Sequence, residues 1–187
     1  MEQLSILFFV LTILTSTTSK NIEGGINMFS FLKKKEEKFQ LKAYLSGKAI
    51  PITEVKDEVF SSKMMGDGLA IIPTTNIVKA PAKGEITVVM GESKHAVGIK
   101  FENGAEALIH VGIDTVSMNG EGFEVFVNVG DKVNVGDKLI EFNPSLIKEK
   151  GFVSDTMLII TNHSDYPNMK IKAGQDVTCE EDVVVEF

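Results

Sequence analysis

Residues 95–111 read HAVGIKFENGAEALIHV, and this stretch carries the clearest fold signal in the chain. Two largely apolar runs, 95–101 and 106–111, stand on either side of Asn103-Gly104. An Asn-Gly pair between two such runs is typical of a β-hairpin, because both residue types tolerate a positive φ in a tight turn. The stretch therefore predicts two antiparallel strands.

The same alternation of short apolar runs and turn residues continues on both sides of this hairpin. Gly, Pro, Asn and Asp separate the runs from Leu41 onward, and further strands are expected at 68–73, 84–89, 124–127, 138–142 and 156–161. Helices are expected to be short turns, such as 145–150 after Pro144. This pattern predicts an all-β fold, an antiparallel β-sandwich of the barrel-sandwich kind.

Composition restricts the class of protein. A chain of 187 residues with 43% hydrophobic residues suits one globular domain with a proper core. The net charge of −7 argues against nucleic acid as a partner, because phosphate backbones are bound by clustered Lys and Arg. Cys179 is the one cysteine, so no internal disulfide can form, which fits a reducing compartment.

The amino-terminal residues 1–27 differ from the rest of the chain. Their apolar run, 4–14, is too short to span a membrane, and neither a basic start nor a small-residue cleavage site accompanies it. We expect a mis-called start or a dispensable extension, with a membrane or export role as the alternative. The segment MFSFLKKKEEK at 28–38 reads as a native start and a solvated charged leader. The expected domain then covers 39–187.

Two of the three histidines, His95 and His110, stand at the outer ends of the predicted hairpin. If Asn103-Gly104 is the central pair of a two-residue turn, His110 faces Val97 and His95 faces Gly112. Both imidazoles then project from one face as diagonal neighbours, roughly 7–8 Å apart between Cα atoms. A register slip of one residue would separate the two faces. The spacing is compatible with one shared site.

A pair of neighbouring imidazoles suits three interpretations. Neutral imidazole is a good nucleophile, and phosphoryl transfer demands positioning and charge stabilisation, which a second imidazole and the backbone amides around Gly112 can supply. A metal site is the second interpretation, although two ligands are too few for a stable zinc site without a further carboxylate or a residue from a partner. The third is two unrelated surface histidines. Spacing alone leaves all three open.

Sequence segments along the chain resemble known modules. The segment NVGDKVNVGDKL at 128–139 resembles the hammerhead turn of lipoyl and biotinyl carriers, which is informative about fold and weak about function. A far more specific resemblance runs from 39 to the carboxyl end, to the glucose-type enzyme IIA domain of the bacterial phosphoenolpyruvate-dependent sugar phosphotransferase system. The matching segments are KHA at 94–96, LIHVGIDTV at 108–116, NGEGF at 119–123, MGDGLAIIP at 65–73, VKAPAKG at 78–84 and DEVF at 57–60.

This resemblance implies separate roles for the two histidines. His110 matches the residue that is phosphorylated on Nε2 by the phosphocarrier protein HPr. His95 matches the second histidine, which hydrogen-bonds the phosphoryl group and is needed for its transfer to the cysteine of a IIB domain. Ser93 stands where the family usually has threonine, whose hydroxyl orients the neighbouring imidazole.

The resemblance also implies a docking surface. Asp57 and Asp114 match acidic residues that face basic side chains of HPr, and Val59, Phe60 and Val116 match apolar residues around the site. The implied fold is again an antiparallel β-sandwich. The implied protein is a cytoplasmic phosphotransferase component that requires no cofactor and meets the membrane only through its permease. In some members the histidine pair binds zinc with a carboxylate from a regulatory partner.

Two rival functions lack the residues they need. A lipoyl or biotinyl carrier needs a lysine at the tip of a hairpin in a suitable context, and none occurs. A zinc peptidase of the lysostaphin-like group needs a His-x-His dyad with further ligands, and the nearest approach is His110-Val111-Gly112. The sequence therefore favours a phosphocarrier.

Overall fold

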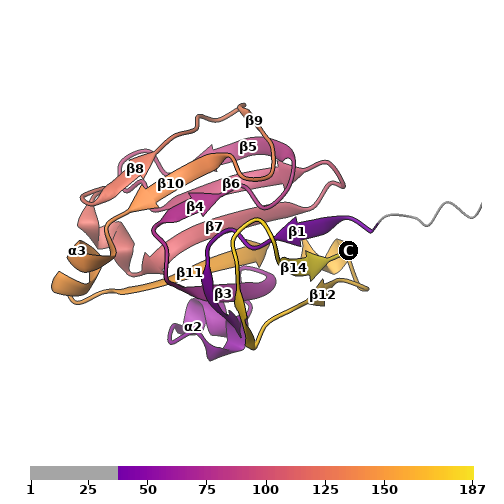
Figure 1. The fold of residues 1–187 in the computed structure, drawn as a ribbon, viewed down its shortest axis with the longest axis horizontal. Helices are drawn as coiled ribbons and strands as arrows, with labels where there is room; N and C mark the ends of the chain where they lie inside the picture. Colours follow the sequence, from indigo (N-terminus) through magenta and orange to yellow (C-terminus); the bar gives the residue numbers. More distant parts are fainter. Residues whose placement is uncertain (1–37) are drawn as a thin grey trace, which may run out of the picture. The chain divides into compact units, whose positions relative to one another are not determined.

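The computed structural model describes residues 38–187, which form an antiparallel β-sandwich (Figure 1). The expected extension 1–27 and all but the last residue of the leader lie outside the described residues. The strands of the sandwich are β1 (Gln40–Lys42), β2 (Gly47–Pro51), β3 (Asp67–Pro73), β4 (Ile77–Lys79), β5 (Gly84–Val89), β6 (Ala96–Phe101), β7 (Glu106–Ile113), β8 (Phe123–Val125), β9 (Lys132–Val133), β10 (Lys138–Phe142), β11 (Val153–Ile160), β12 (Lys170–Ile171), β13 (Gln175–Val177) and β14 (Val183–Glu186). The helices are α2 (Glu58–Ser61), α3 (Pro144–Glu149) and the 3-10 helices η2 (Ile52–Glu54), η3 (Thr115–Met118) and η4 (His163–Asp165).

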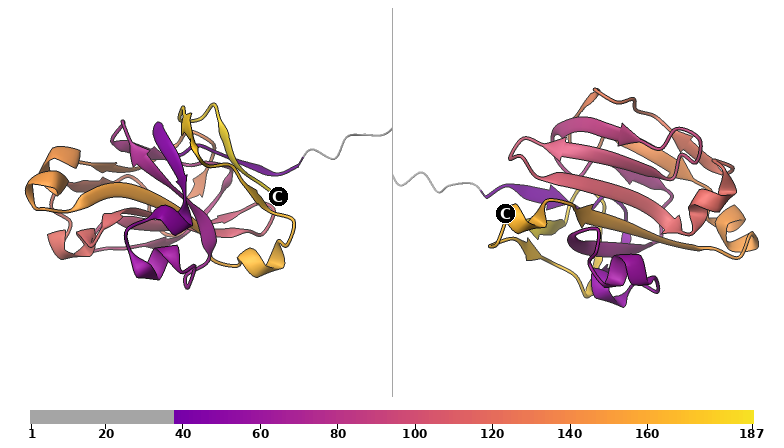
Figure 2. Two further views of the ribbon diagram at one scale, coloured as in Figure 1. Left: turned by 90° about the horizontal axis from the view of Figure 1, so that it is seen from below. Right: turned by 180° about the vertical axis from the view of Figure 1, so that it is seen from behind.

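The strands make one large sheet and two small ones. The eight-stranded sheet has the order β13-β2-β3-β11-β7-β6-β5-β9, and the three-stranded sheets are β1-β14-β12 and β4-β10-β8. The small sheets lie in front of the large one in Figure 1, and the right-hand view of Figure 2 shows the large sheet from behind. This arrangement confirms the predicted all-β sandwich with short helical turns.

The main core fills the space between the large sheet and the small sheets. Alternate residues of β7, Ala107, Ile109 and Val111, point into it, as the period of two in a strand requires. Ile99 of β6 and Phe142 of β10 are at most 1% exposed within it. Each buried aliphatic or aromatic side chain contributes about 1.5–3 kcal/mol, so this core supplies the larger share of the folding energy.

A second, smaller apolar cluster lies on the outer face of the large sheet. Its members come from β2, β3, β7, β11 and the segment containing η2 and α2, and they are Ile50, Ile52, Val55, Phe60, Ala70, Ile113, Met157 and Ile159. The side chain of Asp57 caps α2 by accepting hydrogen bonds from the backbone N–H groups of Val59 (2.9 Å) and Phe60 (3.2 Å). The cap fixes the direction in which Phe60 enters the cluster.

The hairpin between β6 and β7 differs from the predicted register by one residue. Phe101 N–H donates to the carbonyl of Ala105 (2.8 Å) and Gly104 N–H donates to that of Phe101 (2.9 Å), so the loop has three residues, 102–104. Gly104 takes the left-handed conformation (φ 87°) at the last of these, as in a type I turn followed by a bulge. His110 therefore pairs with Ala96 and not with Val97.

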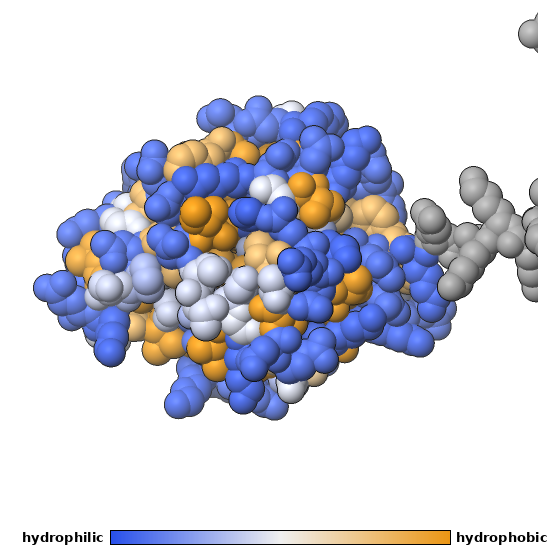
Figure 3. Space-filling model, in the orientation of Figure 1, coloured by the Kyte–Doolittle hydropathy of each residue, from blue (hydrophilic) through white to orange (hydrophobic). Residues whose placement is uncertain are grey.

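The surface and the helices give two further findings. In Figure 3 the face that carries the small sheets is mostly hydrophilic, and its apolar side chains lie in scattered groups. Within residues 38–187, no helix is long and apolar enough to cross a membrane.

Candidate functional site

His95 and His110 lie side by side on the outer face of the large sheet. Their ring centroids are 4.5 Å apart and the rings meet edge to face at 82°. His110 projects from the middle of β7, between Ala96 of β6 and Met157 of β11. The predicted proximity of the two imidazoles is therefore found, although the predicted register is wrong.

His95 reaches this face because it lies just outside the strand. Strict alternation in the observed register would turn position 95 toward the core, but β6 begins at Ala96. Lys94 takes a positive φ of 55°, which ends the preceding turn. The carbonyl of His95 still accepts a hydrogen bond from Val111 N–H (2.8 Å), and the residue is 5% exposed. The turn, and not the pleat, directs this side chain.

Phe60 covers one side of the His110 ring. The two ring centroids are 5.0 Å apart at an interplanar angle of 59°, and Phe60 is 7% exposed. Because Phe60 belongs to the outer cluster, α2 and the sheet together remove water from one side of the imidazole. Phe60 is one of the apolar residues that the family resemblance implies around the site.

Burial keeps both imidazoles neutral. Burial first, and the neighbouring His95 second, lower the pKa of His110 to about 4, although the backbone carbonyls of Gly112 and His110 and the Asp57 carboxylate act in the opposite direction. Burial also lowers the pKa of His95. At neutral pH each ring therefore keeps an unprotonated nitrogen with a free lone pair, which is the form that acts as a nucleophile.

The two nitrogens of each ring lie in different surroundings. Nδ1 of His95 and Nδ1 of His110 are buried and form no hydrogen bond of ordinary geometry with the protein. Nε2 of either ring is not among the buried unpaired atoms. The Gly112 carbonyl acts on the His110 imidazole although it falls short of a well-formed hydrogen bond.

The other predicted site residues lie on segments next to the pair. Asp114 and Val116 follow the end of β7; Asp114 is exposed in a left-handed conformation (φ 61°) and Val116 is 54% exposed. Val59 is 47% exposed on α2. Ser93 lies half-buried in the turn before His95, and in residues 38–187 its hydroxyl forms no hydrogen bond with either imidazole.

Thr115 was missed by the sequence reasoning. It is fully buried, and its hydroxyl donates to the backbone carbonyl of Val111. In the sequence, Thr115 stands out only as one residue of the matching segment GIDTV. The signal that could have identified it is a threonine placed directly after a turn that ends a buried strand, where an orphaned carbonyl needs a donor.

The histidine pair is too small a set of ligands for an ordinary zinc site. No group of three or more His, Cys, Asp and Glu side chains within 38–187 is arranged to hold an ion. A tetrahedral zinc site needs four ligands, more than His95 and His110 together.

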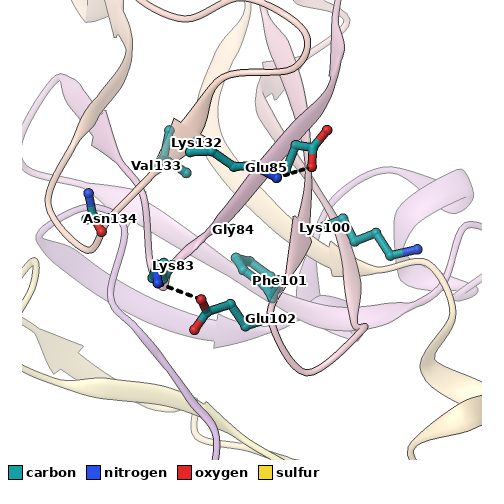
Figure 4. A pocket seen from close by; sticks show the side chains of 9 residues that line it. All are labelled: Lys83, Gly84, Glu85, Lys100, Phe101, Glu102, Lys132, Val133 and Asn134. Atoms are coloured by element: carbon teal, nitrogen blue, oxygen red, sulfur yellow. Dashed lines mark hydrogen bonds and ion pairs between the residues drawn. The ribbon is translucent and has the colours of Figure 1, made fainter.

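A separate cavity of about 440 Å³ opens at the far end of β6 from His95. Figure 4 shows two ion pairs among the side chains that line it, Lys83 with Glu102 and Lys132 with Glu85. Because each of these ammonium groups already has a carboxylate partner, the cavity does not offer the free positive charge that an anionic ligand needs. The histidine pair remains the candidate site.

Comparison with known proteins defines the class. Residues 39–166 match the family described as phosphoenolpyruvate-dependent sugar phosphotransferase system, EIIA 1. The chain is 48% identical over 136 residues to the PTS system glucose-specific EIIA component of Bacillus anthracis, covering 73% of this chain and 82% of that protein. It is 39% identical over 160 residues to the component of the same name from Oceanobacillus iheyensis, covering 86% and 96%.

The fold agrees with a solved structure of the same kind. Glucose permease IIA from Mycoplasma capricolum superposes with a TM-score of 0.70 at 35% identity, covering 80% of this chain and 96% of that one. The chain belongs to the EIIA family of the phosphoenolpyruvate-dependent sugar phosphotransferase system, whose members take phosphoryl groups from HPr and pass them to a IIB domain.

Proposed function

We propose that His110 is the residue that carries the phosphoryl group. The observation that carries this proposal is the pair of rings 4.5 Å apart, with the pKa of His110 lowered to about 4. The lone pair of Nε2 attacks phosphorus, a new N–P bond forms, and the N–P bond of the donor phosphohistidine breaks with its electron pair returning to the donor. His110 remains neutral and nucleophilic throughout the physiological range of pH.

His95 acts on the same group from the side. A phosphoryl group on Nε2 of His110 comes within reach of the His95 ring, because the two rings meet edge to face with their centroids 4.5 Å apart. An N–H of His95 then donates a hydrogen bond to the phosphoryl oxygens and stabilises the charge that develops on transfer to a IIB cysteine. Ser93 is proposed to limit the rotation of His95 from the preceding turn.

The surroundings suit docking of protein partners. Val59 and Val116 are exposed apolar side chains near the site, and Phe60 excludes water from the His110 ring, which favours transfer over hydrolysis. Asp57 and Asp114 are proposed to face basic side chains of HPr. The glucose-specific names of the relatives support the IIB domain of a glucose permease as the acceptor, with transfer taking place in the cytoplasm.

No cofactor enters the proposed transfer step. Zinc is proposed only for a regulatory complex, in which His95 and His110 supply two ligands and a partner carboxylate supplies another.

The test is phosphorylation by a reconstituted donor chain. The protein is incubated with labelled phosphoenolpyruvate, enzyme I and HPr, and acid-labile phosphate on the chain is counted. The wild type should reach one phosphate per chain and His110→Ala should remain unlabelled, while the matched control His163→Ala should behave as the wild type. Equal labelling of His110→Ala and the wild type would overturn the assignment.

A further inference from the structure

Thr115 lies directly beneath the turn that follows the phosphoryl-accepting strand. It is 0% exposed, and its hydroxyl donates to the carbonyl of Val111 at 2.5 Å. Its methyl group lies against the Cα of Gly112, since a Cβ added at Gly112 would come within 2.3 Å of Thr115 Cγ2. The side chain is therefore held by a polar contact and an apolar contact on two successive residues of β7.

Those two residues connect to the two histidines. Val111 N–H donates to the carbonyl of His95 (2.8 Å), and the Val111 carbonyl accepts from the Thr115 hydroxyl. The backbone of Val111 therefore connects Thr115 to His95. Gly112 lies two residues beyond His110, and its carbonyl acts on the His110 imidazole together with the carbonyl of His110 itself, while Nδ1 is buried and has no well-formed hydrogen bond. Thr115 thus contacts the backbone units that set the position of both rings.

The same turn holds backbone in the left-handed region. Gly112 has a φ of 78° and Asp114 a φ of 61°, and this conformation costs about 1 kcal/mol or more for a residue with a Cβ. Gly112 has no Cβ, so the cost applies to Asp114 alone. Asp114 and Val116, on either side of the buried Thr115, are exposed.

We propose that Thr115 is a positioning residue for phosphoryl transfer: by clamping Val111 and Gly112 it aims the Gly112 carbonyl at Nδ1 of His110 and keeps the lone pair on Nε2. This inference rests on the proposed role of His110. Neutral imidazole has two tautomers, and a proton on Nδ1 that points at a carbonyl leaves Nε2 unprotonated and nucleophilic. Without the clamp the carbonyl moves and the Nε2–H tautomer, which cannot attack phosphorus, gains population.

The test compares substitutions that remove either the hydroxyl or the methyl group. Thr115→Val keeps the shape and loses the hydroxyl, whereas Thr115→Ser keeps the hydroxyl. Thr156→Val is the matched control, because Thr156 is equally buried and pairs with Val111 across β11 and β7, but its hydroxyl donates to the backbone carbonyl of Ser154 (3.0 Å) and not to that of Val111. The readouts are the ¹⁵N shifts of the His110 ring, which report the tautomer, and the rate of phosphorylation by phospho-HPr at saturating donor.

Thr115→Val should raise the fraction of Nε2–H tautomer and lower the saturated rate about tenfold, which corresponds to about 1.4 kcal/mol in the barrier. Thr115→Ser should have the tautomer of the wild type and a saturated rate within about twofold of it. Thr156→Val should lower thermal stability comparably and leave the tautomer and the rate unchanged. If Thr115→Val does not fold, Thr115→Ser and Thr115→Ala still differ by the hydroxyl alone.

Two outcomes would contradict the inference. In one, Thr115→Val, or Thr115→Ala in its place, shows the tautomer and the rate of the wild type. In the other, Thr156→Val shifts both quantities as much as Thr115→Val does, which would make the effect one of general stability. A wild-type protein that takes no acid-labile phosphate would instead refute the proposed function, and the two failures are therefore distinguishable.

Discussion

The two faces of the eight-stranded sheet are both apolar, but they are covered to different degrees. The inner face is closed by the two small sheets, and side chains such as Ile109 and Phe142 on that side are at most 1% exposed. The outer face is covered in part by the segment with η2 and α2, and the histidine pair lies where that cover ends. Closed packing on the inner face produces stability, and partial cover on the outer face produces a reactive site.

Partial cover sets the chemistry of His110. A fully exposed imidazole has an ordinary pKa and competes with water for a phosphoryl group, and a fully enclosed one cannot meet a protein partner. Here Phe60 and the sheet remove enough water to lower the pKa of His110 to about 4, while Nε2 is not among the buried unpaired atoms. Four predictions test this contrast between the two faces, from the largest expected effect to the smallest.

The first compares one phenylalanine from the core on each side of the large sheet. Phe142→Ala, in the main core on the inner side, should lower the free energy of unfolding by about 3–5 kcal/mol, because the closed core cannot collapse around the cavity. Phe60→Ala, on the outer face, should cost about 1–2 kcal/mol, since water can enter there. Phe60→Ala should also raise the pKa of His110, which Phe142→Ala should leave alone. Urea unfolding and NMR titration measure both, and equal stability losses would remove the distinction between the faces.

The second concerns the pH dependence of stability. The pKa of His110 lies near 4 in the folded protein and near 6.5 when unfolded, so between these values the unfolded chain binds more protons. The free energy of unfolding should therefore fall as the pH drops from about 6.5 to 4, by about 3 kcal/mol from this residue. The difference between wild type and His110→Gln across that window isolates the contribution. Identical curves would mean that His110 is not desolvated.

The third separates the two histidines of the outer face. His95→Ala should still accept phosphate from phospho-HPr within a few-fold of the wild type, but transfer to a IIB domain should slow about 100-fold, because the stabilising hydrogen bond is lost. The two half-reactions are measured separately with labelled protein. Equal losses in both would contradict the distinct roles proposed for His95 and His110.

The fourth expects no effect. Phospho-HPr is first prepared with enzyme I and its metal, and enzyme I is then removed. With this phospho-HPr as the donor, a chelator should leave the rate of His110 phosphorylation unchanged. The measurement is the single-turnover rate with and without the chelator. A rate that falls on chelation and returns with zinc would show that the half-open face holds a metal during transfer.

Several of the longer strands could be predicted from the sequence. The strands expected at 68–73, 84–89 and 138–142 appear as β3, β5 and β10 within one residue. These runs are long and apolar, so burial of one face determines their conformation. By contrast β9 and β12 have two residues each and exist because longer neighbours pair with them, which leaves no local signal.

The site shows the same division. The resemblance carried by the segments around His95 and His110 identified the family, and the two rings do meet. The route by which they meet was not predictable from the hairpin, because loop length decided the register and a turn at Lys94 decided the direction of His95. Thr115 was also missed, because its role depends on contacts with Val111 and Gly112 that strand periodicity does not report.

The sequence by itself determined the class of fold, the family and the two histidines, because apolar periodicity and a specific motif are local properties of the chain. Tertiary structure alone decided that the pair lies on a half-covered face, that Phe60 desolvates His110, and that Thr115 clamps the turn behind it. Desolvation is a property of everything packed around a group, so it arises only when distant segments such as α2, β7 and β11 come together.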